Sequence, residues 1–177
     1  YNDVVVVATC MSVDPDCSPE IAAMIGSSIA IATSDIPWDG PTASVKVGRV
    51  DGRFVINPTL AQREVSDIDM TVAGTKEAIM MVEAGAKEVP EMVMLDAILF
   101  AHEEIKKIVE FIDQIVAELG KPKMEIELYK PLEEIDAAVR EYATPKMKEA
   151  IHTVDKLERL DNMDAVEVET KEYFAET

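Results

Sequence analysis

The sequence has 177 residues, 17 Lys or Arg against 35 Asp or Glu, and a formal net charge of −18. Its hydrophobic fraction of 48% is ordinary for a globular chain, which excludes global disorder. The longest uncharged stretch, residues 21–34, is shorter than the roughly 20 apolar residues that a transmembrane helix needs. Both halves are acidic, −7 for residues 1–89 and −11 for residues 90–177, so neither supplies the excess of Lys and Arg that a nucleic-acid groove requires.

The first part of the sequence predicts a strand followed by a helix. Residues 4–13 are apolar and β-branched, which indicates a strand buried on both faces. Ser18 and Pro19 are typical of the N-cap and first residue of a helix, which we expect to end near residue 33. Small residues in the middle of this helix indicate that another backbone approaches closely, as in a buried crossover helix.

Alternating apolar and polar residues predict further strands downstream. Asp51 and Gly52 form a two-residue hairpin signal between two such runs. A strand, a helix and several hairpin-linked strands together predict an α+β fold with a mixed sheet. We expect strands at residues 43–48, 54–56, 67–72 and 78–82, with Gly85 ending the last run. Asn57-Pro58-Thr59 should break the strand before it and can cap a short helical piece through Glu64.

The second half predicts helices. From Pro90 to Leu119 the apolar residues recur every three or four positions, which indicates a long amphipathic helix with Gly120 as its C′ residue. Thr144 before Pro145 is typical of a helix start. We therefore expect a linker at residues 121–130, helices at residues 132–143 and 145–174, and two domains, one α+β over residues 1–121 and a small all-helical one over residues 122–177.

The sequence contains no nucleophile motif and no Gly-rich phosphate loop. Cys10 and Cys17 lack the spacing and the neighbouring His of a zinc site, and two cysteines suit a reducing, cytoplasmic location. His102-Glu103-Glu104 lacks the second His of a zincin helix, since residue 106 is Lys, so we expect a hydrogen-bonded His that packs on the apolar stripe.

Four further residues invite a functional interpretation. Asp67 and Asp69 are two apart on a predicted strand, so they could share a face and hold Mg²⁺, although a solvated outer face is the simpler interpretation. His152, with Asp155 three residues on, is typical of a solvated or interhelical pair. Trp38 in a Pro-rich loop could stack on a base, but a lone loop aromatic more often fills a core edge or a subunit contact.

Several runs together resemble the polynucleotide phosphorylase family over about residues 3–123, with a weaker helical match to the end. They are SDIPWDGP at 34–41, VGRVDGRFVINPT at 47–59, SDIDMTVAGT at 66–75, MVEAGA at 81–86 and LDAILFAHEEI at 95–105.

The resemblance implies a phosphorolytic 3′-to-5′ exoribonuclease that degrades mRNA, releases nucleoside diphosphates, uses Mg²⁺ and forms a homotrimer. It implies that residues 1–121 are the later part of a first ribonuclease-PH-like core, with a mixed sheet and packed helices, and that residues 122–177 are part of an all-helical linker domain. The phosphate- and metal-binding residues of the family lie in a second core. The resemblance therefore assigns no catalytic, cofactor-binding or metal-binding residue to this chain, Asp67 and Asp69 included.

We expect this portion to act as a trimer scaffold and as support for an RNA channel. The acidic helices would repel RNA from wrong paths by like charge, a hypothesis motivated by the −11 of residues 90–177. The alternative is a freestanding acidic adaptor whose helices bind a basic protein.

Overall fold

The computed structural model describes residues 3–175 and divides between residues 126 and 127 into two compact units. We call residues 3–126 the α/β unit and residues 127–175 the helical hairpin, and each is described by itself. The α+β fold class is confirmed. No helix among the described residues is long and apolar enough to cross a membrane.

A four-stranded antiparallel sheet forms the centre of the α/β unit, in the order β2-β1-β3-β4. Its strands are β1 (Ala43–Val50), β2 (Arg53–Ile56), β3 (Ile68–Gly74) and β4 (Ile79–Ala86). The β1–β2 hairpin turns at Asp51 and Gly52, whose φ angles of 50° and 75° explain why the sequence has an Asp-Gly pair there. The hairpin and all four predicted strands are confirmed, with β4 extending past Gly85 to Ala86.

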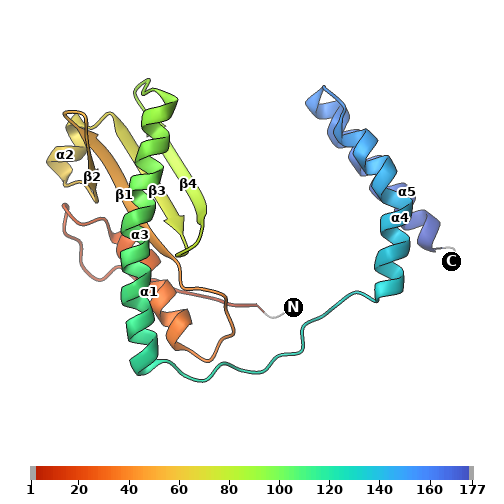
Figure 1. Ribbon diagram of the computed structural model, residues 1–177, viewed down its shortest axis with the longest axis horizontal. Coiled ribbons are helices and arrows are strands. Elements are labelled where there is room, and N and C mark those ends of the chain that lie inside the picture. The colour runs from red at the N-terminus through yellow and green to blue at the C-terminus, as the bar shows by residue number, and fades with distance from the viewer. Residues whose placement is uncertain (1–2, 176–177) are drawn as a thin grey trace. The chain divides into compact units, whose positions relative to one another are not determined.

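Helix α3 (Glu91–Leu119) covers one face of this sheet, as Figure 1 shows in green. Every second side chain of β1 and β3 points at it, and these residues form the hydrophobic core with one stripe of α3. The long amphipathic helix is therefore confirmed. Gly120 ends it in an extended conformation, with φ −65°, and not in the left-handed conformation of most C′ glycines. The buried residues of this core are Ala43, Val45, Val47, Ile68, Met70, Val72, Ala97, Ala101, Ile105 and Val109.

Two shorter helices complete the α/β unit. Helix α1 (Pro19–Thr33) has the predicted bounds, but the Ser18 hydroxyl donates to the Glu20 carboxylate and does not cap the helix. Helix α2 (Leu60–Val65) begins with a capping box, in which Thr59 and Gln62 each accept a hydrogen bond from the other's backbone N–H. The break before this helix and its N-cap were both predicted.

The strand predicted at residues 4–13 is wrong. These residues form neither helix nor strand and pair with no described strand, and their valines are exposed. A strand needs a neighbour for its N–H and C=O groups, and none of the four strands is hydrogen-bonded to this segment in the sheet. For the same reason the sheet of the described residues is purely antiparallel and not mixed, and α1 does not cross over between two strands of this sheet.

The helical hairpin consists of α4 (Glu133–Ile151) and α5 (Lys156–Ala175). The predicted break at Thr144 and Pro145 is wrong, because α4 continues through Pro145. The chain breaks instead at residues 152–155, where one Asp155 carboxylate oxygen accepts the backbone N–H groups of Leu157 and Glu158, each at 3.0 Å. A carboxylate at the start of α5 satisfies N–H groups that have no partner within the helix.

Candidate functional site

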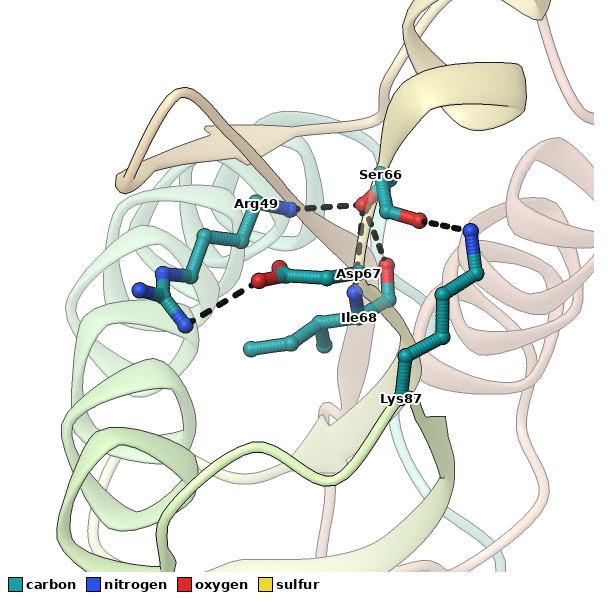
Figure 2. Close-up of polar contacts among 5 residues, drawn as sticks. All are labelled: Arg49, Ser66, Asp67, Ile68 and Lys87. Carbon is teal, nitrogen blue, oxygen red and sulfur yellow. Dashed lines mark hydrogen bonds and ion pairs between the residues drawn. The ribbon is translucent and has the colours of Figure 1, made fainter.

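A cluster of polar contacts joins α2, β1, β3 and the end of β4 at Ser66, the residue that follows α2 (Figure 2). The Ser66 hydroxyl accepts the backbone N–H of Arg49 at 2.8 Å and donates to the Ile68 carbonyl at 2.6 Å. The side chain of Lys87 donates to the Ser66 carbonyl at 3.0 Å. Ser66 is only 7% exposed, so these bonds form in a nearly dry environment. All of these partners of the Ser66 side chain are backbone groups, which makes it a structural hub and not an activated nucleophile.

Asp67 extends this cluster toward β1. Its carboxylate lies 3.2 Å from the Arg49 guanidinium (Figure 2). Its backbone N–H donates to the Arg49 carbonyl at 3.2 Å, and its carbonyl accepts the backbone N–H of Lys87 at 3.0 Å. The second carboxylate oxygen is buried and has no partner among the described residues. The ion pair is partly exposed, so its main effect is to fix the geometry of the turn into β3.

The structure does not give Asp67 and Asp69 the shared strand face that their spacing suggested. Asp67 precedes β3, and its carboxylate turns to Arg49, which lies on the same face of β1 as the core residues Val45 and Val47. Asp69 lies opposite Gly48, on the other face of the sheet. Both residues border a hollow of about 260 Å³ that Arg63, Ser66, Ile68, Gly85, Ala86 and Lys87 also line.

This arrangement does not fit a Mg²⁺ site. Among residues 3–175, no three side chains of His, Cys, Asp or Glu come close enough together to hold a metal ion. One oxygen of Asp67 is already paired with Arg49, and the basic side chains of Arg63 and Lys87 border the same hollow. A divalent cation would therefore meet positive charge where it needs further oxygen ligands.

The two histidines lie in different places. His102 is half-buried on α3, and its Nε2 lies 3.1 Å from the Thr75 carbonyl, which confirms the packed, hydrogen-bonded His that the apolar stripe predicted. His152 is exposed at the end of α4. No ion pair joins it to Asp155 within the described residues, since Asp155 caps α5 instead.

The cysteines and Trp38 also have structural surroundings. Cys10 and Cys17 are free thiols, both exposed. The Trp38 ring lies directly over Gly40, in the space that a side chain at residue 40 would occupy. Trp38 also borders an apolar hollow of about 350 Å³ beside α1, so its position agrees with a loop aromatic that fills a core edge.

An aromatic and charged cluster between α4 and α5 was not predicted. The rings of Tyr142 and Tyr173 stack with centroids 4.1 Å apart, and Lys146 Nζ lies 3.7 Å from the centroid of the Tyr142 ring. Glu169 accepts hydrogen bonds from Lys146 at 2.7 Å and from the Tyr142 hydroxyl at 3.1 Å, and these bonds lower the pKa of the Glu169 carboxyl. The only sequence signal is the spacing of Tyr142 and Lys146, four apart on one helix face.

Comparison with known proteins shows what the chain is similar to. Residues 40–104 match the 3′ exoribonuclease family, domain 2. The whole chain is similar to polyribonucleotide nucleotidyltransferases: 66% identical over 173 residues to that of Clostridioides difficile, and 58% identical over 174 residues to that of Brevibacillus brevis. Each match covers 98% of this chain. The chain spans about a quarter of the length of these relatives, 25% and 24% respectively.

Proposed function

We propose that this chain, which is homologous to one quarter of the polyribonucleotide nucleotidyltransferases, works as a segment of a phosphorolytic 3′-to-5′ exoribonuclease. Such an enzyme transfers the terminal nucleotide of an RNA, including mRNA in degradation, to inorganic phosphate and releases a nucleoside diphosphate. The observation that carries this proposal is the 66% identity along 98% of the chain, which extends from the α/β unit through the helical hairpin.

Within that enzyme we assign this segment a scaffolding role. The polar side chains best placed for chemistry in the α/β unit, Ser66 and His102, bond to backbone groups. The Asp67–Asp69 pair does not fit a metal. These observations support a division of labour in which Mg²⁺ and phosphate bind to a second ribonuclease-PH-like core of the same protein, outside this chain.

The proposal also covers organisation and assembly. We assign residues 1–121 to the later part of the first core and residues 122–177 to part of an all-helical linker domain, and the structural division after residue 126 supports a boundary in this region. The intact enzyme would be a cytoplasmic homotrimer. The −11 charge of residues 90–177 supports a role beside the RNA channel, where acidic side chains repel RNA from unproductive paths.

A chimera tests this function. This chain replaces the corresponding quarter of the Clostridioides difficile polyribonucleotide nucleotidyltransferase, and the purified chimera is incubated with RNA, inorganic phosphate and Mg²⁺. We expect release of nucleoside diphosphates by the chimera and none by the chain alone. A chimera that assembles like its parent but releases no nucleoside diphosphates would contradict the assignment.

Two controls separate the scaffolding role from the alternatives. In the chimera, Asp69→Asn should leave kcat and KM unchanged. The reason is that Asp69 is exposed on the sheet, and its carboxylate makes no hydrogen bond or ion pair with another described residue. A large loss of kcat in this variant, or nucleoside diphosphate release by the isolated chain, would place chemistry within the chain. A failed chimera together with tight binding of the chain to a basic protein would instead favour the adaptor.

A further inference from the structure

The C-terminal end of α1 lacks the local features that normally end a helix. The last turn contains no basic residue, and the C-cap Ser34 is extended, with φ −75° and ψ 177°. No glycine follows to provide a left-handed cap. The last four carbonyls of a helix have no partner within it, so those of α1 need donors from elsewhere.

Some of these carbonyls are satisfied locally. The Thr33 hydroxyl donates to the carbonyls of Ile29 and Ala30, at 2.8 and 3.4 Å. The Ser34 hydroxyl and backbone N–H donate to the Ile31 carbonyl, at 2.8 and 3.2 Å. This local set leaves the carbonyls of Ala32 and Thr33 without a donor from the helix or its loop.

The segment that follows α3 supplies the missing donors. The backbone N–H of Lys121 donates to the Thr33 carbonyl at 3.0 Å, and the Lys123 ammonium donates to the Ala32 carbonyl at 2.8 Å. The same ammonium donates to the carbonyls of Ile31 at 3.2 Å and Ser34 at 2.7 Å.

One further backbone bond continues along the loop after α1, from the N–H of Met124 to the Asp35 carbonyl at 2.8 Å. Figure 1 shows the chain leaving the end of α3 beside α1.

We propose that residues 121–124 form a strap that caps α1 from a distant part of the sequence and anchors the start of the connection to the helical hairpin. A cation at the negative end of a helix dipole, with its three N–H donors directed at carbonyls, is a favourable use of a lysine. Because the strap joins the end of α1 to the start of this connection, loss of the strap bonds should loosen both segments together. Residues 125–132 are the part of the connection that lies outside the strap and before α4.

Lys121 provides a matched control for Lys123. Both lysines are in the strap, but the Lys123 side chain donates hydrogen bonds to the end of α1, while Lys121 contributes its backbone N–H. Replacing Lys121 by Met removes the same charge and leaves the backbone bond in place. Replacing Lys123 by Met removes the cation and its three hydrogen bonds.

Hydrogen exchange of backbone amides in the full chain, with the variants Lys123→Met and Lys121→Met, tests the strap. We expect Lys123→Met to speed exchange of the residue 121 and 124 amides about tenfold. This factor is at the low end of what the loss of hydrogen bonds from a charged group at an exposed helix end should cause. Cleavage after Glu125 by a glutamate-specific protease should accelerate in parallel, because the chain there is released. Lys121→Met should change neither rate.

Three results would overturn the strap. The first is equal rates of amide exchange and of cleavage after Glu125 in Lys123→Met and Lys121→Met. The second is equal acceleration of exchange at residues 121, 124 and the β1 core amides Val45 and Val47, since that pattern means global destabilisation and not local release. Lys123→Arg provides a rescue test: it keeps a cation with several donors, so it should restore most of the protection, and failure to do so contradicts the capping role.

Discussion

Replacing Ser66 by Ala should destabilise the α/β unit far more than the loss of one hydroxyl at the surface. The hydroxyl accepts the Arg49 N–H at 2.8 Å and donates to the Ile68 carbonyl at 2.6 Å, with the residue 7% exposed. Alanine leaves the Arg49 N–H buried without an acceptor and creates almost no cavity. A buried donor left without its partner costs about 1–3 kcal/mol, so we expect a loss of about 2 kcal/mol in the free energy of unfolding.

Urea unfolding followed by tryptophan fluorescence measures this effect. Trp38 is the single tryptophan of the chain and lies in the α/β unit, so its signal reports that unit and not the helical hairpin. Ser12→Ala is the matched control, since Ser12 is exposed and the same atoms are removed; we expect a change within about 0.5 kcal/mol. If both variants unfold at the same urea concentration with the same slope, the Ser66 hydroxyl does not organise the turn into β3.

Three other predictions concern the core, the sheet and the hairpin. Ile105→Ala should cost about 3 kcal/mol, because Ile105 is fully buried between α3 and the sheet; calorimetry gives the value, and a cost under about 1 kcal/mol would contradict the packing. Gly74→Ala should cost about 2 kcal/mol, because a Cβ there meets the Ala78 carbonyl at 2.5 Å, whereas Gly85→Ala meets nothing within 4 Å and should be nearly neutral by thermal unfolding. The lowered pKa of Glu169, due first to Lys146, means that its contribution to hairpin stability is present above pH about 4.5 and is lost as the pH falls through the folded pKa. Glu169→Gln should flatten this acid dependence in far-UV circular dichroism, and an unchanged profile would refute the assignment.

Elements specified by neighbouring residues could be predicted from the sequence. The β1–β2 hairpin follows from Asp51 and Gly52, which tolerate positive φ, and α3 follows from an apolar period sustained from residue 92 to residue 119. In both cases the signal lies within the element itself. The bounds of α1 were also predicted, because Pro at the first helical position marks the start directly.

Features that depend on distant partners could not be predicted. Residues 4–13 have strand composition, but composition does not supply the neighbouring strand that their backbone needs. At Pro145 the chain stays helical despite the local signal for a helix start. Proline has no backbone N–H, so α4 loses one hydrogen bond, the one to the carbonyl of Glu141. Glu141 is exposed, so water can bond to that carbonyl instead. The partners of Ser66 and Lys123 lie up to 92 residues away, beyond any local pattern.

Four polar side chains of the α/β unit share one use that bears on the proposed function. His102, Lys87 and Lys123 each contact main-chain carbonyls of loops or helix ends, and the Ser66 hydroxyl bonds to the backbone of β1 and β3. A group committed in this way fixes the course of the chain but is not available to transfer a proton or hold a ligand. Catalytic groups must be held in position by surroundings that do not move. Side chains that stabilise the loops of their own segment therefore agree with the scaffolding role proposed above.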